Sequence, residues 1–229
     1  MSGRISALAE FVPAGCVAAD IGTDHARLPA FLVQNGICPR VIATECRPGP
    51  LENARRNLSE KGLLDRVDLR LGDGLKVLKP GEASVLVLAG MGGGTIRDIL
   101  AASGEVTASA RVLVLQPMGG AGELRAWLSQ NGWRIKDEKL VEEGGRIYAV
   151  IAAVPGREEL SDPLILELGP RLWEKGMSEP LFCRYVKALI DKYSRILKGI
   201  SLAKNRSWAE KKLFLENAIS RLKEAAACR

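Results

Sequence analysis

Acidic side chains follow three apolar runs of the sequence, at the positions where β-strands are expected to end. These side chains are Asp20, Glu45 and Asp73, which follow residues 17–19, 41–44 and 67–71. A fourth run, residues 84–89, is followed by glycines in Gly90-Met91-Gly92. In open α/β sheets a ligand lies outside the carboxyl ends of the strands, so these strand ends are expected to surround one ligand.

The first of these strand ends has the densest set of candidate residues. Asp20 is followed by a turn that contains Gly22, Thr23, Asp24 and His25. A glycine lets the backbone come close to a ligand where a side chain would collide with it. An ordinary turn without a ligand also accommodates this glycine, and the spacing is not the complete G-x-G-x-x-G of dinucleotide sites.

The charges at the strand ends favour a cationic ligand. No lysine or arginine lies in the first turn and acidic groups surround it, so a pyrophosphate would be repelled. S-adenosylmethionine, which has a sulfonium and an ammonium, would be attracted. Glu45 can accept both hydroxyls of a ribose and Asp73 the exocyclic amine of an adenine, while the glycines after residues 84–89 leave space for a second substrate. Each acid taken alone also fits a helix N-cap or a turn.

Five strand–helix units and a final hairpin are expected to position these residues. The remaining expected elements are a strand at 111–115 and helices at 3–12, 26–34, 51–61, around Ile99 and around Trp127. Two strand-like runs, 133–141 and 146–154, are joined by Glu-Glu-Gly-Gly, which indicates a hairpin rather than a crossover. This order predicts an α/β fold, a doubly wound sheet with one antiparallel strand near its edge.

The last third of the chain has a different pattern. Prolines and glycines interrupt residues 155–180, with a short helix expected near 164–175. Two longer helices are expected after residue 179, with apolar residues at the 3-and-4 spacing of a coiled-coil seam. The short link between them predicts an antiparallel helical hairpin.

Basic charge is concentrated in this helical segment. Residues 156–229 contain 15 Lys and Arg against 10 Asp and Glu, whereas residues 1–155 contain 18 against 17. The excess predicts a polyanionic partner, and an exposed helical face with extra lysines is the alternative. The candidate phosphate-binding residues are Lys187, Lys192, Arg195, Lys198, Lys204, Arg206, Lys211 and Lys212.

Several classes of protein are disfavoured by composition. The sequence has no apolar run of about 18 residues for a transmembrane helix, and Glu10 interrupts the apolar core that a signal peptide would need. We therefore expect a cytoplasmic protein without membrane contact. The five cysteines form no C-x-x-C pair and His25 is the single histidine, so no structural zinc site and no other metal site is expected.

Four motifs make the chain resemble a known family. They are Asp20-Ile-Gly-Thr-Asp-His-Ala-Arg-Leu-Pro29, Gly72-Asp-Gly74, Ala89-Gly-Met-Gly-Gly93 and Gln116-Pro117. In type and order they resemble the bacterial tRNA (adenine-22, N1)-methyltransferases of the TrmK type. The resemblance implies a Rossmann-like class I methyltransferase domain at residues 1–155 and a coiled-coil domain at residues 156–229 that binds tRNA. It also implies methylation of an adenine in the D-arm of tRNA, with S-adenosyl-L-methionine as the cofactor.

The resemblance also implies a role for each candidate. Asp20, Gly22, Thr23 and His25 would line the methionine part of the cofactor, Glu45 would hold the ribose, and Asp73 and Gly74 would hold the adenine. The glycine-rich segment Gly90, Met91 and Gly92 would complete the cofactor set and face the target base.

Catalysis at N1 of adenine is expected to need charge stabilisation rather than proton removal. N1 already has a lone pair in the ring plane, and the product ring is cationic, so a nearby carboxylate would stabilise it. Asp24 is the candidate carboxylate, Gln116 a candidate hydrogen-bond partner for the base, and His25 either orients a substrate or fixes the loop. Residues 84–89 are not followed by an Asn-Pro-Pro-type motif, which argues against methylation of N6.

Other functions stay open on the sequence alone. A nicotinamide-dependent oxidoreductase would need a glycine-rich pyrophosphate turn and a hydride-transfer partner, and neither is evident. A non-catalytic RNA-binding module, or a methyltransferase acting on another RNA, a protein or a small molecule, would have the same fold. The helical seam can be closed within one chain or between two, and a monomer is preferred.

Overall fold

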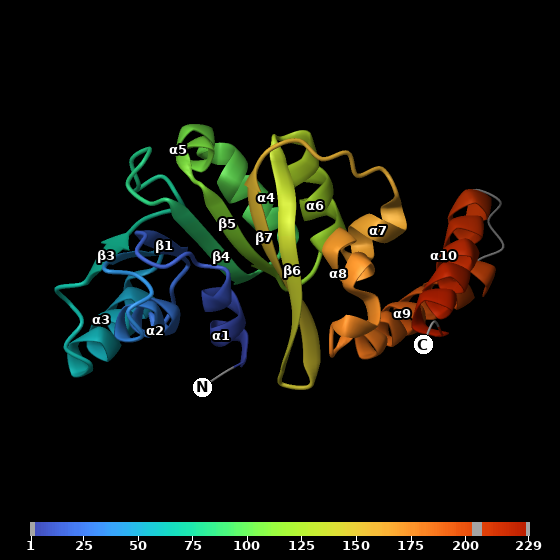
Figure 1. The fold of residues 1–229 in the computed structure, drawn as a ribbon, viewed down its shortest axis with the longest axis horizontal. Helices are drawn as coiled ribbons and strands as arrows, with labels where there is room; N and C mark the ends of the chain where they lie inside the picture. The colour runs from blue at the N-terminus through green and yellow to red at the C-terminus, as the bar shows by residue number, and fades with distance from the viewer. Residues whose placement is uncertain (1–2, 203–207, 228–229) are drawn as a thin grey trace.

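The computed structural model describes residues 3–202 and 208–227. Its centre is a seven-stranded sheet of order β3-β2-β1-β4-β5-β7-β6 (Figure 1). The first five strands pair in parallel, β7 is antiparallel to β5, and β6 is antiparallel to β7. The predicted doubly wound sheet with one antiparallel strand near its edge is confirmed.

The strands are β1 (Ala18–Ile21), β2 (Val41–Glu45), β3 (Val67–Leu71), β4 (Val85–Met91), β5 (Val112–Pro117), β6 (Trp133–Glu143) and β7 (Arg146–Pro155). The helices that cover the sheet are α1 (Gly3–Glu10), α2 (Arg27–Gln34), α3 (Pro48–Glu60), α4 (Gly93–Ala102), α5 (Gly104–Ser109) and α6 (Ala121–Gln130). The C-terminal helices are α7 (Pro163–Leu168), α8 (Pro170–Lys175), the short η1 (Gly176–Ser178), α9 (Phe182–Leu202) and α10 (Ala209–Ala227).

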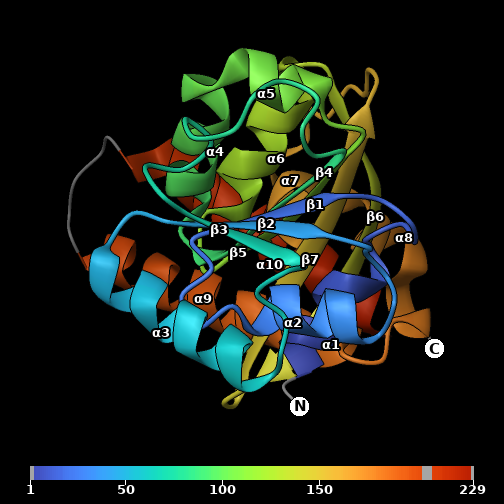
Figure 2. The same cartoon turned by 90° about the vertical axis from the view of Figure 1, so that its left-hand side faces the viewer.

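Two helical layers cover the sheet. Helices α1, α2 and α3 lie on one face and α4, α5 and α6 on the other (Figure 2). Successive side chains of a strand point to opposite faces, so Ala18 of β1 packs in the first layer and Ala19 in the second. Because both faces are covered, the inner strands are apolar without alternation.

The β6–β7 hairpin returns the chain to the carboxyl edge of the parallel strands. Strand β6 runs in the same direction as β5, since both are antiparallel to β7. Its last residue, Glu143, therefore lies at the edge where β1 and β4 end. The turn uses Gly144 and Gly145 with φ of 58° and 73°, and a two-residue turn of type I′ needs positive φ at both positions.

The C-terminal helices form an apolar cluster of their own. Helices α9 and α10 pack against each other as the predicted hairpin, through residues such as Val186 and Leu215. Leu164 and Leu168 of α7 join this cluster. In Figure 1 these helices extend away from the β6 edge of the sheet.

A buried ion pair joins these helices to the sheet. Arg125 of α6 and Glu138 of β6 are fully buried, and Nε lies 2.7 Å from Oε1. Nη1 of Arg125 donates to the carbonyls of Leu166 and Glu167 at 2.7 and 2.9 Å. Oε2 of Glu138 accepts the backbone N–H of Arg171 at 3.0 Å. Both charged groups are therefore shared between the sheet and the segment α7–α8.

This pair explains why the helix expected near 164–175 is divided in two. A Cβ on Gly169 would lie 2.7 Å from Oε2 of Glu138 and 2.9 Å from Nη2 of Arg125, and Gly169 has φ of 111°. Only glycine fits this position, so α7 ends there and Pro170 begins α8.

The structure also differs from the expected elements at α3, α5 and β4. Helix α3 begins at Pro48 rather than at residue 51, because a proline in the first turn lacks only an N–H that has no partner there. Helix α5 was not predicted, since its six residues bury only Val106 and Thr107 and show little periodicity. Strand β4 continues past residue 89 to Met91 through a bulge at Gly90.

Among residues 3–202 and 208–227, no helix has the length and apolar character needed to span a membrane. The same residues contain no cluster of three or more His, Cys, Asp or Glu side chains suited to a metal ion.

Candidate active site

A cavity of about 640 Å³ opens at the carboxyl ends of β1 and β4. It brings together six of the predicted site residues, namely Asp20, Gly22, Thr23, Asp24, His25 and Gly90. Its wall also contains Arg4 of α1 and Glu143 of β6, which the sequence did not suggest. The cavity is large enough for a small organic ligand.

The loop after β1 has a constrained backbone. The carbonyl of Thr44 accepts the N–H groups of both Gly22 and Thr23 at 2.9 Å, and Gly22 has φ of 74°. Asp24 and Ala26 also have positive φ, 50° each, which is uncommon outside glycine and typical of functional loops. The side chains of Asp24 and His25 reach the cavity mouth, with Nε2 of His25 3.7 Å from Oδ2 of Asp24. The main chain thus fixes the point from which both side chains project.

Asp20 is a buried carboxylate that forms no ion pair with a side chain of residues 3–202 or 208–227. It is 7% exposed, and its Oδ2 accepts the hydroxyl of Thr23 at 2.7 Å. Burial raises the pKa of Asp20 to about 6, although the bond from Thr23 lowers it. A buried carboxylate is stabilised by a positive ligand, so this side chain fits an ammonium or a sulfonium in the cavity.

Glu45 is buried beside the cavity rather than in its wall. Its carboxylate accepts the backbone N–H groups of Asp24, Cys46 and Arg47 at 3.3, 3.1 and 3.2 Å. Oε1 also accepts the Sγ–H of Cys46 at 3.5 Å, whereas among the described residues Oε2 accepts the N–H of Asp24 alone, so Oε2 keeps a lone pair for a ribose hydroxyl. Glu45 therefore also fixes the Asp24 loop to the end of β2.

Asp73 and Gly74 line a separate cavity of about 240 Å³, together with Thr95 and Ile99 of α4. The Asp73 side chain is exposed, and Oδ2 lies 2.6 Å from Nζ of Lys76. The structure thus separates the predicted adenine-binding residues from the cavity of Asp20. Gly74 has φ of 58° and its carbonyl accepts the hydroxyl of Thr44 at 3.4 Å.

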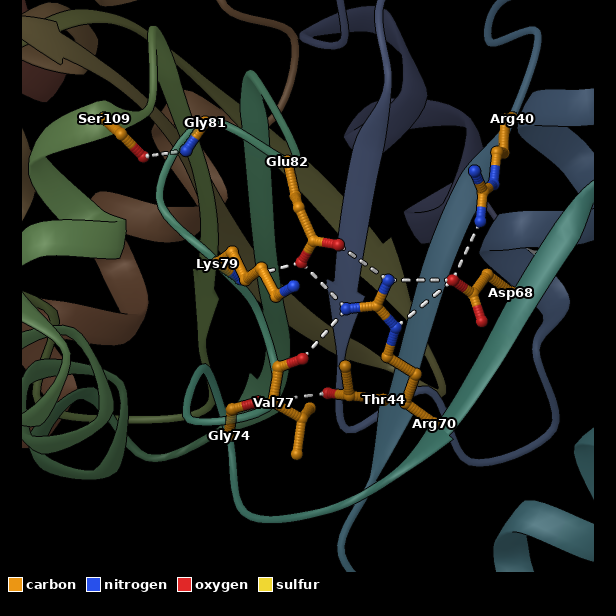
Figure 3. Close-up of polar contacts among 10 residues, drawn as sticks. All are labelled: Arg40, Thr44, Asp68, Arg70, Gly74, Val77, Lys79, Gly81, Glu82 and Ser109. Carbon is orange, nitrogen blue, oxygen red and sulfur yellow. Dashed lines mark hydrogen bonds and ion pairs between the residues drawn. The ribbon is translucent and has the colours of Figure 1, made fainter.

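Arg70 fastens the loop after β3 that contains Gly74, as Figure 3 shows. Its guanidinium donates to both carboxylate oxygens of Glu82 at 2.8 and 3.0 Å and to the carbonyl of Val77 at 2.8 Å. Asp68 holds the other side of Arg70 at 2.8 Å. The bond from Arg70 lowers the pKa of Glu82 to about 2, so this anchor stays charged at neutral pH.

Gln116 lies behind the glycine-rich floor of the cavity. It is fully buried, its Oε1 accepts the N–H of Gly90 at 3.1 Å, and its Nε2 donates to the carbonyl of Pro117 at 3.1 Å. These bonds hold the β4 bulge in place. Gln116 does not line the cavity and its amide is bonded to the backbone, so a bond from Gln116 to a substrate base stays a prediction.

Met91 and Gly92 also lie outside the cavity wall. A Cβ on Gly22 would lie 3.2 Å from Cε of Met91, so the Met91 side chain packs against the turn that follows Asp20. Gly92 is the N-cap of α4. The adjacent Gly93 is sterically obligatory, since a Cβ there would lie 2.4 Å from the carbonyl oxygen of Gly120.

The sequence did not predict three charged residues of the cavity wall, namely Arg4, Arg27 and Glu143. The first turn itself contains no lysine or arginine, but Arg4 and Arg27 bring basic side chains to the cavity beside it. Arg27 lies within the motif Asp20–Pro29 itself, directly after the turn. Glu143 is predictable from topology, because a hairpin that follows β5 must turn at the carboxyl edge.

The basic residues of the C-terminal helices are largely exposed. Lys192 lies 2.6 Å from Glu167, and Lys211 lies over the ring of Trp208 at 4.9 Å. Lys192 and Arg195 line a cleft of about 670 Å³ between α9, the segment after β5 and the first residues of β7. Met118 belongs to both this cleft and the Asp20 cavity. Lys204 and Arg206 lie outside the described residues.

Comparison with known proteins identifies the family. Residues 1–151 match the model of the family described as a methyltransferase domain. The tRNA (adenine(22)-N(1))-methyltransferase of Bacillus subtilis is 39% identical over 170 residues, which cover 74% of this chain and 71% of that protein. The chain belongs to the tRNA (adenine(22)-N(1))-methyltransferase family.

Solved structures of this family have the same fold over nearly the whole chain. The crystal structure of the B. subtilis m1A22 tRNA methyltransferase TrmK superimposes with a TM-score of 0.87 at 33% identity, covering 99% of this chain and 98% of that one. M. capricolum TrmK in complex with S-adenosylhomocysteine gives a TM-score of 0.81 at 25% identity, covering 99% and 97%. The C-terminal helices are thus included in the likeness.

The residues of this family member fit its cofactor. A positive ligand would pair with Asp20, which has no cationic partner in the described part of the chain, and Glu45 retains acceptor capacity next to the turn. The positive φ of Gly22 and Gly90 opens the backbone on two sides of the cavity. These features agree with the methyltransferase family in which the chain is placed.

Proposed function

We propose that the protein transfers a methyl group from S-adenosyl-L-methionine to N1 of adenine 22 in the D-arm of tRNA. The observation that carries this proposal is the buried Asp20, which no cation among the described residues pairs with, in a cavity beside the glycine-rich floor, in a chain of this family. When bound, S-adenosyl-L-methionine supplies a methyl group activated by its sulfonium. All other contributions come from side chains and backbone of the protein.

Each strand end has its part in holding the cofactor. Asp20 pairs with the ammonium or sulfonium, with Gly22, Thr23 and His25 around the methionine part. Glu45 accepts a ribose hydroxyl while it holds the loop. Asp73 and Gly74 border the adenine in the neighbouring cavity, after Asp73 exchanges Lys76 for the exocyclic amine.

The chemical step depends on position and charge. N1 of adenine attacks with its in-plane lone pair, so no general base is required, and the ring becomes cationic. Asp24 is exposed at the cavity mouth and stabilises that charge, while His25 orients the base or the loop. Alignment of the nucleotide accounts for most of the rate, because the leaving group is already good.

The two parts of the chain divide the work. Residues 1–155 bind the cofactor, and residues 156–229 bind tRNA through the basic residues of α9 and α10. The cleft that contains Lys192 and Arg195 supports this division, because it meets the active-site cavity at Met118. An adenine extruded from its stack would enter the cavity while its strand follows the cleft.

The protein is proposed to act as a cytoplasmic monomer. The apolar seam between α9 and α10 is closed within one chain, through buried residues such as Leu215 and Leu222. A dimer is therefore not needed to bury it.

The proposal is tested by incubating the protein with S-adenosyl-L-methionine and an unmodified tRNA transcript. We expect one 1-methyladenosine per transcript, located at position 22 by mass spectrometry of nuclease fragments. A transcript with guanosine at position 22 is the matched control and should stay unmodified. Methylation of the control transcript at another base would refute the assigned position, and methylation of neither would refute the reaction.

The role of the C-terminal helices is tested by charge reversal. Replacing Lys187, Lys192, Arg195 and Lys198 by glutamate should weaken tRNA binding by at least about 100-fold at low salt, because phosphate contacts and counterion release are lost. Binding of S-adenosylhomocysteine should not change. A matched variant reverses Arg40, Lys61, Lys79 and Arg111, which lie toward the amino ends of the strands, and should bind tRNA nearly as well as wild type. Equal tRNA affinity of both variants would remove the proposed role.

A further inference from the structure

Arg4 reaches the active-site cavity from a part of the chain that none of the chemical motifs includes. It lies in the first turn of α1, which is anchored by the buried residues Ala7, Leu8 and Ala9. Helix α1 packs against β6, β5 and α2. The guanidinium of Arg4 is therefore delivered to the cavity by packing elsewhere in the helix.

The contacts of Arg4 leave part of its hydrogen-bonding capacity unused. Nε lies 3.0 Å from Oε2 of Glu143, and Nη1 lies 3.5 Å from Oε1 of Gln116 and 3.9 Å from Sδ of Met118. A guanidinium has five N–H donors. Within the described part of the chain Nη2 makes no hydrogen bond, and 30% of the side chain is exposed. Arg4 can therefore bind an anion without first leaving a buried position.

The charges of the cavity fall into two groups with different uses. Asp20 suits the cationic cofactor, and Asp24 the positive charge of the methylated ring. A nucleotide also brings phosphates, which neither acid can bind. A planar guanidinium is the side-chain group best matched to a phosphate, and Arg4 places one beside Glu143 at the wall formed by α1 and the hairpin.

We infer that Arg4 binds a backbone phosphate next to the target adenosine and that Glu143 holds the guanidinium until RNA arrives. The inference rests on the proposed function, since it takes RNA as the substrate. The carboxylate of Glu143 occupies the position of the phosphate oxygens. When RNA binds, Arg4 exchanges the carboxylate for the phosphate, and Glu143 turns to solvent.

A purely structural pair is a weaker explanation. Both side chains are about 30% exposed, and ion pairs between partly exposed groups contribute little to stability. The buried face of α1 already fixes the helix. In addition, the pair is placed in the wall of the cavity, where an anion of the substrate would meet it.

The test measures binding of unmodified tRNA to the protein loaded with S-adenosylhomocysteine, at several salt concentrations. Arg4→Gln should weaken binding by about tenfold, and should reduce the slope of log K against log salt by about 0.7 to 0.9, the value for one phosphate contact. Glu143→Gln should tighten binding, because the competing carboxylate is removed. In the double variant the gain from Glu143→Gln should disappear.

Arg40→Gln is the matched control. Arg40 is also paired with one carboxylate, that of Asp68 at 2.9 Å, and precedes β2 at the opposite edge of the sheet (Figure 3). Its variant should keep the wild-type salt slope. Affinity for S-adenosylhomocysteine and the thermal midpoint verify that each variant is folded, and Arg4→Lys should recover part of the slope.

Two results would overturn the inference. One is an Arg4→Gln variant with the wild-type salt slope. The other is a Glu143→Gln variant that weakens tRNA binding as Arg4→Gln does, since a structural pair would be lost equally from either side. Failure of the proposed function looks different: the wild-type protein would form no 1-methyladenosine, whereas the salt slopes would still decide whether Arg4 contacts phosphate.

Discussion

Asp20→Asn is expected to weaken binding of S-adenosylhomocysteine by about 100-fold at pH 8. Asparagine has the same shape and can still accept the hydroxyl of Thr23, but it cannot pair with the ligand's ammonium. A hydrogen bond between charged groups contributes about 1.5–3 kcal/mol in a protein, which corresponds to roughly 10- to 150-fold in affinity. Calorimetric titration of wild type and variant measures the difference.

The same substitution should stabilise the protein without ligand. The pKa of Asp20 rises from 3.8 to about 6 on folding, so the folded state binds more protons than the unfolded state between these values. Its stability contribution therefore falls as pH rises from about 4 to about 6. Asp20→Asn lacks this loss, and its free energy of unfolding at pH 8 should exceed that of wild type by up to about 3 kcal/mol. Urea unfolding of both proteins gives this value.

The pH dependence of binding provides the control. Affinity of wild type should rise by at most about tenfold per pH unit until pH is near 6 and then level off, because the cation needs the ionised carboxylate. Besides Asp20, five charged or titratable side chains face the cavity, namely Arg4, Asp24, His25, Arg27 and Glu143. A His25→Gln variant should keep the profile, whereas Asp20→Asn should flatten it. If His25→Gln lost the pH dependence instead, the titrating group would be His25, and the role given to Asp20 would be contradicted.

The sequence predicts the sheet well because the signal is local. Uninterrupted apolar runs identify buried parallel strands, and the glycine pair after β6 identifies the hairpin. Once the strands are parallel, their carboxyl ends must share one edge. For this reason the sequence alone places Asp20, Asp24, His25 and Gly90 at one site.

The sequence gives little information where position depends on packing between distant segments. Arg4 reaches the cavity because α1 packs on β6. No sequence motif near Arg4 predicts this contact. Gln116 follows a strand as the acids do, yet its amide turns inward to satisfy the N–H of Gly90 in a bulge that the apolar run does not reveal. Asp73 lines a second cavity, whose opposite wall is formed by α4, and the packing of α4 cannot be read from the residues around Asp73. These are properties of side-chain direction and layer packing rather than of residue type.

Glu138→Gln is expected to disconnect the C-terminal helices from the active site. The substitution keeps the shape of the side chain but leaves the fully buried Arg125 without its counter-charge. Breaking one side of a buried ion pair costs about 3–5 kcal/mol. Because Glu138 also accepts the N–H of Arg171, and Arg125 holds the carbonyls at the end of α7, the loss falls at the junction. Urea unfolding followed by circular dichroism measures the cost.

The effect on function should separate the two parts of the molecule. Binding of S-adenosylhomocysteine should change little, since Glu138 does not line the Asp20 cavity. The rate of tRNA methylation should fall by about 100-fold, because a target base misplaced by about 1 Å loses that much rate. Glu10→Gln is the matched control: Glu10 of α1 pairs with Lys139 of β6 at 2.5 Å, but both side chains are partly exposed, so stability and activity should change little.

A double variant distinguishes the junction from a general defect of the fold. Replacing Arg125 by methionine and Glu138 by leucine removes both charges and fills the space with apolar groups, a change that is often neutral for stability. We expect it to recover most of the stability lost in Glu138→Gln. If methylation recovers as well, apolar packing suffices to hold α7 and α8. If stability recovers while methylation stays low, the directional bonds of Arg125 to Leu166 and Glu167 set the angle at which the helices present tRNA to Asp24. Loss of cofactor binding in Glu138→Gln would contradict both explanations, because the damage would then extend to the sheet edge itself.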